Sequence, residues 1–501
     1  MRDLAYLKLL SREYPNIRAA ASDIINLQAI CGLPKGTEYF FSDLHGEHEA
    51  FIYLLRSSSG IIREKIRETF GHIISEEDEV RLANLIYYPE KMINQIKQAN
   101  EYTEDWQKTA VYRLVQICRE VSSKYTRSKV RKKMPREFSG VIDELLYVDN
   151  TDDNKTEYYS ELINTLIDVR VADSFIVVIC SLIRSLTIDN LHILGDIFDR
   201  GPRPDIILEE LMHFHDVDIQ WGNHDISWMG AATGNRACIC NVLRMALGYN
   251  GFDVLEDGYG INLRPLSMFA ERVYRDDPCT CFLPQILDKN IYDAVDPKLA
   301  AKMHKAIAVL QYKEEGQIIK RHPEYGMEER ILLSAIRYDR GTVTIDGKEY
   351  PMRDMNFPTV DPADPLRLTD EEEELLHTLE LSFRHNTRLH EHVRFLYSNG
   401  SMYKCCNSNL LYHGCIPMTE NREFDGLMVG GKMYRGKELM DFIDTQVKNA
   451  YFLPEDAPEK EACRDFMWYL WNGAKSPVFG KDKNRSFEHY FIEDPEVMRE
   501  T

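Results

Sequence analysis

The sequence predicts a mixed α/β (α+β) protein in which a few buried strands are joined by helices and by long helical segments. Three segments share one pattern of an apolar strand, a tight polar turn and a helix: residues 36–55, 189–211 and 217–232. Buried strands that lead into polar loops place the loop residues at the carboxyl ends of the strands, where α/β sheets bind ligands. We therefore expect the functional residues in these three turns.

The composition predicts a soluble globular protein. Apolar residues make up 44% of the 501 residues and charged residues 28%, a balance typical of a chain with a full hydrophobic core. The formal net charge of −20 argues against a nucleic-acid partner, because polyanion binding requires a basic surface.

The sequence shows no signal for secretion or membrane insertion, and we therefore expect a cytoplasmic protein with no membrane partner. No secretory signal precedes the core, and the most apolar stretch, Phe175 to Leu194, is interrupted by Arg184 and Asp189. We expect the 11 cysteines to be reduced.

The spacing of the three segments predicts two long insertions. The second and third turns are separated by one βα unit of about 30 residues, whereas the first two are much farther apart. We expect an N-terminal helical segment at 1–32, formed by one amphipathic helix, and one domain at 33–501 with helical insertions at about 56–170 and 235–395.

Two later stretches carry hairpin signals. In GTVTIDGKEY, Asp346 and Gly347 suit a type I′ turn. Residues 394–417, RFLYSNGSMYKCCNSNLLYHGCIP, predict paired strands with Asn-Gly and Asn-Ser turns that end at His413.

Five residues in these turns form a candidate set of metal ligands. They are Asp43 and His45 in a D-x-H motif, Asp196 in GDIFDRG, Asn223 in GNHD, and His413. Asp43 and His45 suit one metal, Asn223 and His413 suit a second, and Asp196 is placed to bridge the two. Mixed oxygen and nitrogen ligands favour Mn²⁺, Fe or Zn²⁺ over Ca²⁺. Two such cations would suit hydrolysis of a phosphate ester, because they clamp the phosphate and acidify a water molecule.

Three further residues are candidates for catalysis and substrate binding. His224, as an imidazolium, could protonate the leaving alkoxide, and Asp199 could orient it. Arg200 offers a planar fork to phosphate oxygens. D-x-H or GNHD alone would be weak evidence and GDIFDRG is stronger, but three motifs in this order, each after an apolar strand, point to one site.

The motifs resemble those of the calcineurin-like metallophosphatase superfamily, and one branch in particular. The segments FFSDLHGEHEAF, LHILGDIFDRGPRPDIIL, IQWGNHDISWMGAA, LLYHGCIPM and MWYLWNGAKSPVFGKDK resemble firmicute-type, class III fructose-1,6-bisphosphatases. The resemblance extends from about residue 36 to residue 492. It implies a metallophosphatase β-sandwich flanked by helices, with Mn²⁺ as cofactor. It also implies hydrolysis of fructose 1,6-bisphosphate to fructose 6-phosphate and phosphate, a step of gluconeogenesis.

One part of the superfamily pattern is not found. A final G-x-H motif is expected after His413, and the single later histidine, His489, has no glycine two residues before it. The chain is therefore expected to lack the family's C-terminal part and to have an incomplete second metal site.

Two other functions remain open from the sequence. A protein phosphatase or dinucleotide polyphosphate hydrolase would share the first two motifs, and an inactive truncated remnant would explain the missing one. The protein could form an oligomer under each of these functional hypotheses.

Overall fold

The computed structural model describes residues 2–71, 73–147, 153–285 and 296–494. It divides into two compact units. The first consists of Met1–Tyr39 and Ile52–Asn190, and the second of Phe40–Phe51 and Leu191–Thr501. The protein is a mixed α/β structure, as the sequence predicts.

The first unit is helical. Its core is formed by apolar faces that repeat at helical spacing, such as Val111, Leu114 and Val115 packing against Phe175 and Ile179. Its helices are α1 (Arg2–Glu13), α2 (Ile17–Cys31), α4 (Ile61–Phe70), α5 (Glu76–Tyr87), α6 (Pro89–Gln98), α7 (Glu104–Ser122), α8 (Arg127–Lys133), α9 (Ser139–Tyr147), α10 (Asp153–Asp168) and α11 (Ala172–Thr187). Helix α3 (His48–Ser57) crosses the boundary between the units, and a short 3-10 helix, Ser58–Gly60, follows it.

The N-terminal segment contains two helices, whereas the sequence predicts one. Helix α1 ends before Pro15, which lacks the N–H that a continuing helix would need. Asn16 then caps α2, because its side chain accepts a hydrogen bond from the backbone N–H of Ala19.

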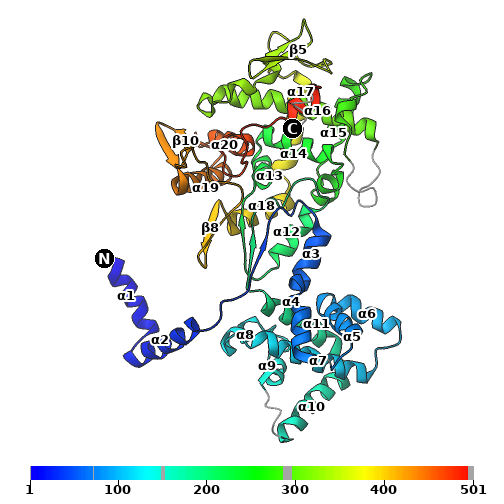
Figure 1. Cartoon of the computed structure of the whole chain (residues 1–501), viewed down its shortest axis with the longest axis vertical. Helices are drawn as coiled ribbons and strands as arrows, with labels where there is room; N and C mark the ends of the chain where they lie inside the picture. The colour runs from blue at the N-terminus through cyan, green and yellow to red at the C-terminus, as the bar shows by residue number, and fades with distance from the viewer. Residues whose placement is uncertain (1, 72, 148–152, 286–295, 495–501) are drawn as a thin grey trace. The chain divides into compact units, whose positions relative to one another are not determined.

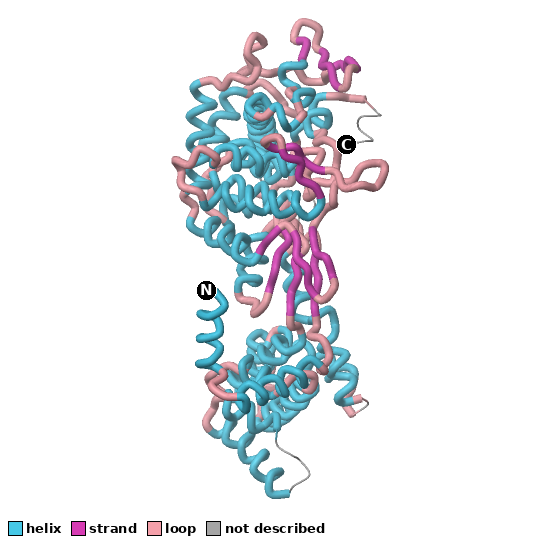
Figure 2. The backbone as a smooth tube through the Cα atoms, turned by 90° about the vertical axis from the view of Figure 1, so that its left-hand side faces the viewer, coloured by secondary structure: helices cyan, strands magenta, loops and turns pink. Residues whose placement is uncertain are grey.

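A four-stranded sheet carries the three strand–turn–helix segments. Its strand order is β1 (Glu38–Phe41), β2 (Asn190–Ile193), β3 (Val217–Gln220) and β7 (Gly400–Ser401). Strands β2 and β3 are parallel, as are β3 and β7. Figure 2 shows these short strands side by side. The turns after β2 and β3 therefore meet at one edge of the sheet.

The remaining strands form three small sheets. They are β4 (Ile336–Arg337), β5 (Thr342–Ile345) and β6 (Lys348–Pro351), then β8 (Tyr403–Cys406) with β9 (Asn409–Tyr412), and β10 (Gly426–Val429) with β11 (Lys432–Arg435).

The helices of the second unit pack around α13, α14 and α16 (Figure 1). They are α12 (Pro204–Met212), α13 (Asn223–Thr233), α14 (Arg236–Gly248), α15 (Arg264–Val273), α16 (Pro297–Arg321), α17 (Asp370–Arg384), α18 (Thr387–Asn399), α19 (Gly436–Phe452), α20 (Lys460–Asn472) and α21 (Ser486–Phe491). Short helical turns lie at Val254–Gly258, Thr280–Phe282, Pro323–Tyr325, Glu328–Arg330 and Leu332–Ala335.

Two of the three predicted turns are confirmed. Asp346 and Gly347 join β5 to β6 with positive φ angles of 50° and 77°, and Asn407 and Ser408 join β8 to β9. The predicted Asn399-Gly400 turn is wrong, because α18 continues through Asn399 and β7 begins at Gly400.

Within the described ranges, the structure contains no helix of the length and apolarity that crossing a membrane requires.

Candidate active site

Main-chain hydrogen bonds join the turn after β1 to the turn after β2. The N–H of Asp43 donates to the carbonyl of Gly195 over 3.1 Å, and the N–H of His45 donates to the carbonyl of Asp196 over 2.9 Å. The spacing between the two motifs is therefore set by the backbone, whatever side chains they carry.

Asp225 joins the turn after β2 to the start of α13. One carboxylate oxygen accepts hydrogen bonds from the N–H groups of Asp196 (2.8 Å) and Gly222 (3.0 Å). The other accepts from Ile197 (2.9 Å) and Phe198 (3.3 Å). A fully buried carboxylate with four N–H donors fixes both turns in one arrangement.

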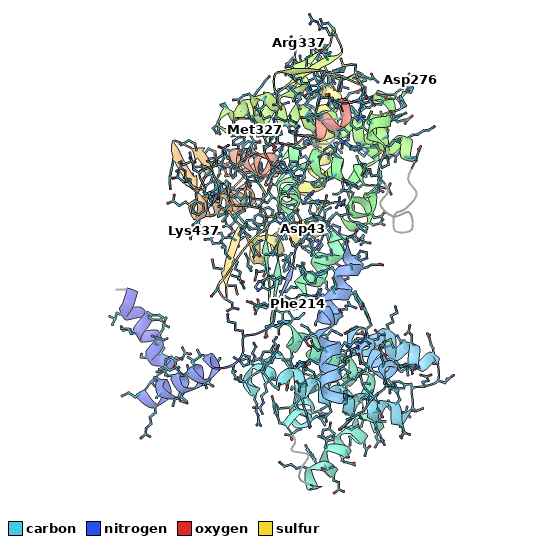
Figure 3. The ribbon with its side chains drawn as sticks, viewed as in Figure 1. Asp43, Phe214, Asp276, Met327, Arg337 and Lys437 are labelled. Atoms are coloured by element: carbon cyan, nitrogen blue, oxygen red, sulfur yellow. The ribbon has the colours of Figure 1, made fainter. Side chains whose placement is uncertain are left out.

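Acidic and imidazole side chains converge between these turns. Asp43, Asp196 and His413 each offer a ligand atom, and these atoms lie within 4.8 Å of one another. Nε2 of His413 is 3.3 Å from Oδ2 of Asp196, and Nε2 of His45 is 3.8 Å from the same oxygen. Figure 3 labels Asp43 at this position in the second unit.

The hydrogen bonding of His413 leaves one ring nitrogen for a metal. Nδ1 lies 2.6 Å from the carbonyl oxygen of Leu194, so that Nδ1–H donates to this oxygen. In the neutral ring the lone pair is then on Nε2, which faces Asp196. This is the usual second contact of a metal-ligating histidine, and the residues present therefore fit a divalent cation.

The backbone of these residues is locally strained. Asp43, His45 and Asp196 have φ angles of 54°, 47° and 54°, in the left-handed region that residues other than glycine rarely adopt. Such strain is concentrated at functional sites. Gly222 shows how close the approach is, because a Cβ atom there would lie 2.0 Å from Oδ1 of Asp196.

Charges in the cluster depend on one another. Burial alone would raise the pKa of Asp196, but hydrogen bonds from His413 and His45 hold it well below its ordinary value. Burial lowers the pKa of His413, but the neighbouring Asp196 carboxylate outweighs this effect and raises it to about 9. A cation that takes the place between them must release a proton from His413.

His224 lies beside this cluster, at the start of α13. Its Nδ1 is 3.4 Å from Oδ1 of Asp199, which directs Nε2 away from Asp199. The indole of Trp471, on α20, packs edge-on against the imidazole at 4.9 Å between ring centroids. Burial lowers the pKa of His224, although the charge of Asp199 opposes the shift. The ring therefore takes up a proton less readily than a free imidazole.

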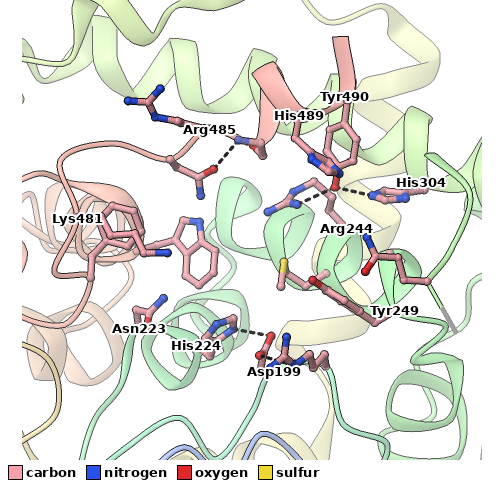
Figure 4. A pocket seen from close by; sticks show the side chains of 18 of the residues that line it. Asp199, Asn223, His224, Arg244, Tyr249, His304, Lys481, Arg485, His489 and Tyr490 are labelled. Atoms are coloured by element: carbon pink, nitrogen blue, oxygen red, sulfur yellow. Dashed lines mark hydrogen bonds and ion pairs between the residues drawn. The ribbon is translucent and has the colours of Figure 1, made fainter. Parts of the chain in front are cut away.

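A cavity of about 910 Å³ extends from His224. Asp199, Arg200 and Asn223 line it near the acidic cluster, and Figure 4 shows Asn223, His224 and Asp199 together at one end. The guanidinium of Arg200 also lies 6.0 Å from the ring centroid of Tyr249.

The structure thus brings together all eight residues that the sequence singles out. Asp43, His45, Asp196 and His413 form the cluster, and Asp199, Arg200, Asn223 and His224 line the cavity beside it. His489, the histidine that follows His413 in the sequence, lines the same cavity.

Sequence reasoning missed two residues of the site. A signal for Asp225 was present in the sequence. It is the third residue of helix α13, a position at which a carboxylate can accept hydrogen bonds from backbone N–H groups. Trp471 had no comparable signal, because its contact with His224 joins segments almost 250 residues apart in the chain.

Comparisons with known proteins agree on one family. The model of the family described as firmicute fructose-1,6-bisphosphatase matches residues 5–501. A "Fructose-1,6-bisphosphatase class 3" of Clostridium tetani is 51% identical over 498 residues, which are 99% of this chain and 75% of the relative. Proteins of the same name from Bacteroides fragilis and Alkaliphilus metalliredigens are 50% and 51% identical, over 100% and 99% of this chain and 75% of each relative. The search of solved structures found no match.

Proposed function

The chain belongs to the firmicute fructose-1,6-bisphosphatase family, and we propose that it hydrolyses fructose 1,6-bisphosphate to fructose 6-phosphate and phosphate, a step of gluconeogenesis. The observation that carries this proposal at the level of the site is the cluster of Asp43, Asp196 and His413 beside a cavity lined by His224. The cluster offers anionic ligands that could bind metal cations, and the cavity beside it offers space for a phosphorylated sugar.

The same residues support Mn²⁺ as the cofactor. Asp43, His45 and Asp196 would hold one cation, and Asp196, Asn223 and His413 a second, through the mixed oxygen and nitrogen ligands that suit Mn²⁺. Bound cations would neutralise charge on the phosphoryl oxygens and lower the pKa of a water molecule.

The side chains beside the cluster would carry the proton transfer. In hydrolysis the oxygen of water bonds to phosphorus, the ester P–O bond breaks, and the leaving alkoxide takes a proton. Nε2 of His224 would give that proton, while Asp199, 3.4 Å from Nδ1, holds the ring in place. The negative charge of the bound phosphate would raise the pKa of His224 and so load it with the proton. Arg200 would bind phosphate oxygens.

The same proposal covers the fold, the location and the choice among related functions. The four-stranded sheet would form part of a calcineurin-like sandwich within residues 33–501. Helical insertions at about 56–170 and 235–395 would interrupt this domain, and the helical segment 1–32 would precede it. A phosphorylated sugar as substrate supports a location in the cytoplasm. The family match over residues 5–501 supports this function over the alternatives within the superfamily.

A substrate panel tests the proposed function. The purified chain with Mn²⁺ is given fructose 1,6-bisphosphate, a phosphoserine peptide or diadenosine tetraphosphate, and product formation is measured. We expect phosphate release chiefly from the bisphosphate, with the Asp196→Asn variant as the inactive control. Preferred turnover of the peptide or the dinucleotide would refute the assignment, and no turnover of any substrate would favour an inactive protein.

A further inference from the structure

The two N-terminal helices, α1 and α2, expose a large apolar surface. Their large apolar side chains are 40–88% exposed: Leu4, Tyr6, Leu7, Leu9, Ile17, Ile24, Ile25, Leu27 and Ile30. No residue of α2 is buried, and the described core of the first unit includes no side chain from either helix. An exposed apolar surface of this extent marks an interaction site in a soluble protein.

Five side chains of α2 repeat at the spacing of a coiled coil. They lie three and four residues apart in alternation: Ile17, Ala20, Ile24, Leu27 and Cys31. This alternation keeps one stripe of side chains, here called the α2 seam, facing a second helix along its whole length. None of the five side chains carries a formal charge. The α2 seam therefore fits the apolar stripe of another helix.

The chemistry of the α2 seam matches a second copy of itself. Isoleucine and leucine at the two core positions of a heptad, as at Ile24 and Leu27, favour a pair of parallel helices. In a parallel pair with twofold symmetry, each seam residue faces its own counterpart. Apolar side chains then meet apolar side chains from Ile17 to Cys31.

Helix α1 extends the surface that a pair of copies would bury. The hydroxyl of Tyr14, directly after α1, donates to Oδ2 of Asp23 on α2 over 2.6 Å and so joins the two helices. Helix α1 has 12 residues and α2 has 15. Together they reach the roughly 20–30 residues that a standard interface takes from each partner.

A membrane surface fits α2 less well. Helices that lie on membranes carry lysine and arginine along their polar face, which attract anionic lipids. Helix α2 has one basic side chain, Arg18, and one acidic side chain, Asp23. It therefore has no net charge with which to bind such a surface.

We propose that the chain forms a homodimer by parallel pairing of α2 along its seam, with α1 of each copy beside it. This inference concerns the first unit and does not rest on the proposed function. Pairing places the two Cys31 side chains opposite each other at the carboxyl end of the seam. Cys31 is an exposed free cysteine, so that its thiol can report the arrangement.

Two adjacent isoleucines provide matched variants. Ile24 lies in the α2 seam, whereas Ile25 lies outside it, and their exposed fractions are similar at 62% and 69%. Sedimentation velocity of the full chain over a range of concentrations measures dimerisation. We expect Ile24→Asp to weaken the dimer at least about 100-fold, because two carboxylates would be buried against each other. Ile25→Asp should change the dissociation constant by no more than about threefold, as a surface substitution does.

Oxidative cross-linking reports the orientation of the helices. Diamide takes two electrons and two protons from a pair of thiols, and a disulfide forms where the two sulfur atoms can meet. We expect a disulfide-linked dimer from the wild type and from Cys405→Ser, which removes another exposed cysteine, and none from Cys31→Ser.

The remaining outcomes contradict the proposal. A monomeric wild type, a dimer that survives Ile24→Asp, or an equal loss in Ile24→Asp and Ile25→Asp would overturn it. A dimer without the Cys31 cross-link would refute parallel pairing. A monomer that binds phosphatidylglycerol vesicles, and loses this binding in Ile24→Asp, would assign the α2 seam to a membrane instead.

Discussion

Replacement of Asp225 by asparagine should both destabilise the protein and empty the proposed metal site. Each carboxylate oxygen accepts two backbone N–H groups, and the amide substitutes an NH₂ donor for one oxygen. Two buried N–H groups then lose their acceptor. At about 1–3 kcal/mol for each unsatisfied group, the expected loss in the free energy of unfolding is about 2–6 kcal/mol. This is a large share of the roughly 5–15 kcal/mol by which a domain is stable.

The effect on metal binding follows from the same contacts. The amide can no longer hold both the backbone at Asp196 and Gly222 and the backbone at Ile197 and Phe198. Asp196 would leave its position relative to His413, so that the cluster of ligand atoms opens. The measurements are urea denaturation and Mn²⁺ content of the purified variant.

A second buried aspartate provides the matched control. Asp205 is fully buried on α12 and pairs with Arg203 and Arg388, away from the cluster. Asp205→Asn should also reduce stability but should retain Mn²⁺ in the folded protein. Wild-type stability and metal content in Asp225→Asn would refute the reasoning. Equal metal loss in both variants would show that general unfolding, and not the positioning of Asp196, is the cause.

Three further predictions concern individual side chains. Asp196→Asn should remove most bound Mn²⁺, whereas Asp199→Asn should retain it and lower turnover; metal analysis beside an activity assay distinguishes them. His224→Ala should lower turnover of the sugar ester about 10²- to 10⁴-fold, and the loss should be smaller for an aryl phosphate, whose leaving group needs no proton. His304 is buried with Nδ1 near the carbonyl of Phe282 and Nε2 near the Tyr490 hydroxyl, and burial lowers its pKa to about 3. The pKa of His304 is lower in the folded protein than in the unfolded chain. Its contribution to the free energy of unfolding is therefore complete above about pH 6.5 and is lost as the pH falls toward 3. The cost is about 3 kcal/mol at about pH 4.5, and His304→Gln, measured by denaturation against pH, should flatten this dependence.

The sequence predicted best where local pattern and three-dimensional position coincide. Asp43, Asp196 and Asn223 each lie two or three residues beyond the end of a short strand, so that the sheet alone brings them to one edge. The Asp346-Gly347 turn is likewise local, since positive φ angles at two adjacent residues decide it.

The misses have physical reasons that no local pattern reveals. Asn399-Gly400 resembles a turn, but Leu389, Val393 and Leu396 repeat at helical spacing and are buried. Burial of this apolar face outweighs the local turn preference, so that α18 continues to Asn399. Trp471 looks like an ordinary residue of an amphipathic helix in the sequence. Its place at the cavity results from the packing of α20 with α13, which depends on long-range contacts.

The main-chain bonds between the first two turns have a consequence for how such a site could be redesigned. Since Asp43 and His45 are anchored through their own N–H groups, the anchor does not depend on which side chain each position carries. One ligand could be exchanged for another, a carboxylate for an imidazole, without moving the backbone that presents it. The same frame is therefore a scaffold on which metal preference could be retuned by single substitutions, while the geometry between the two turns is inherited unchanged.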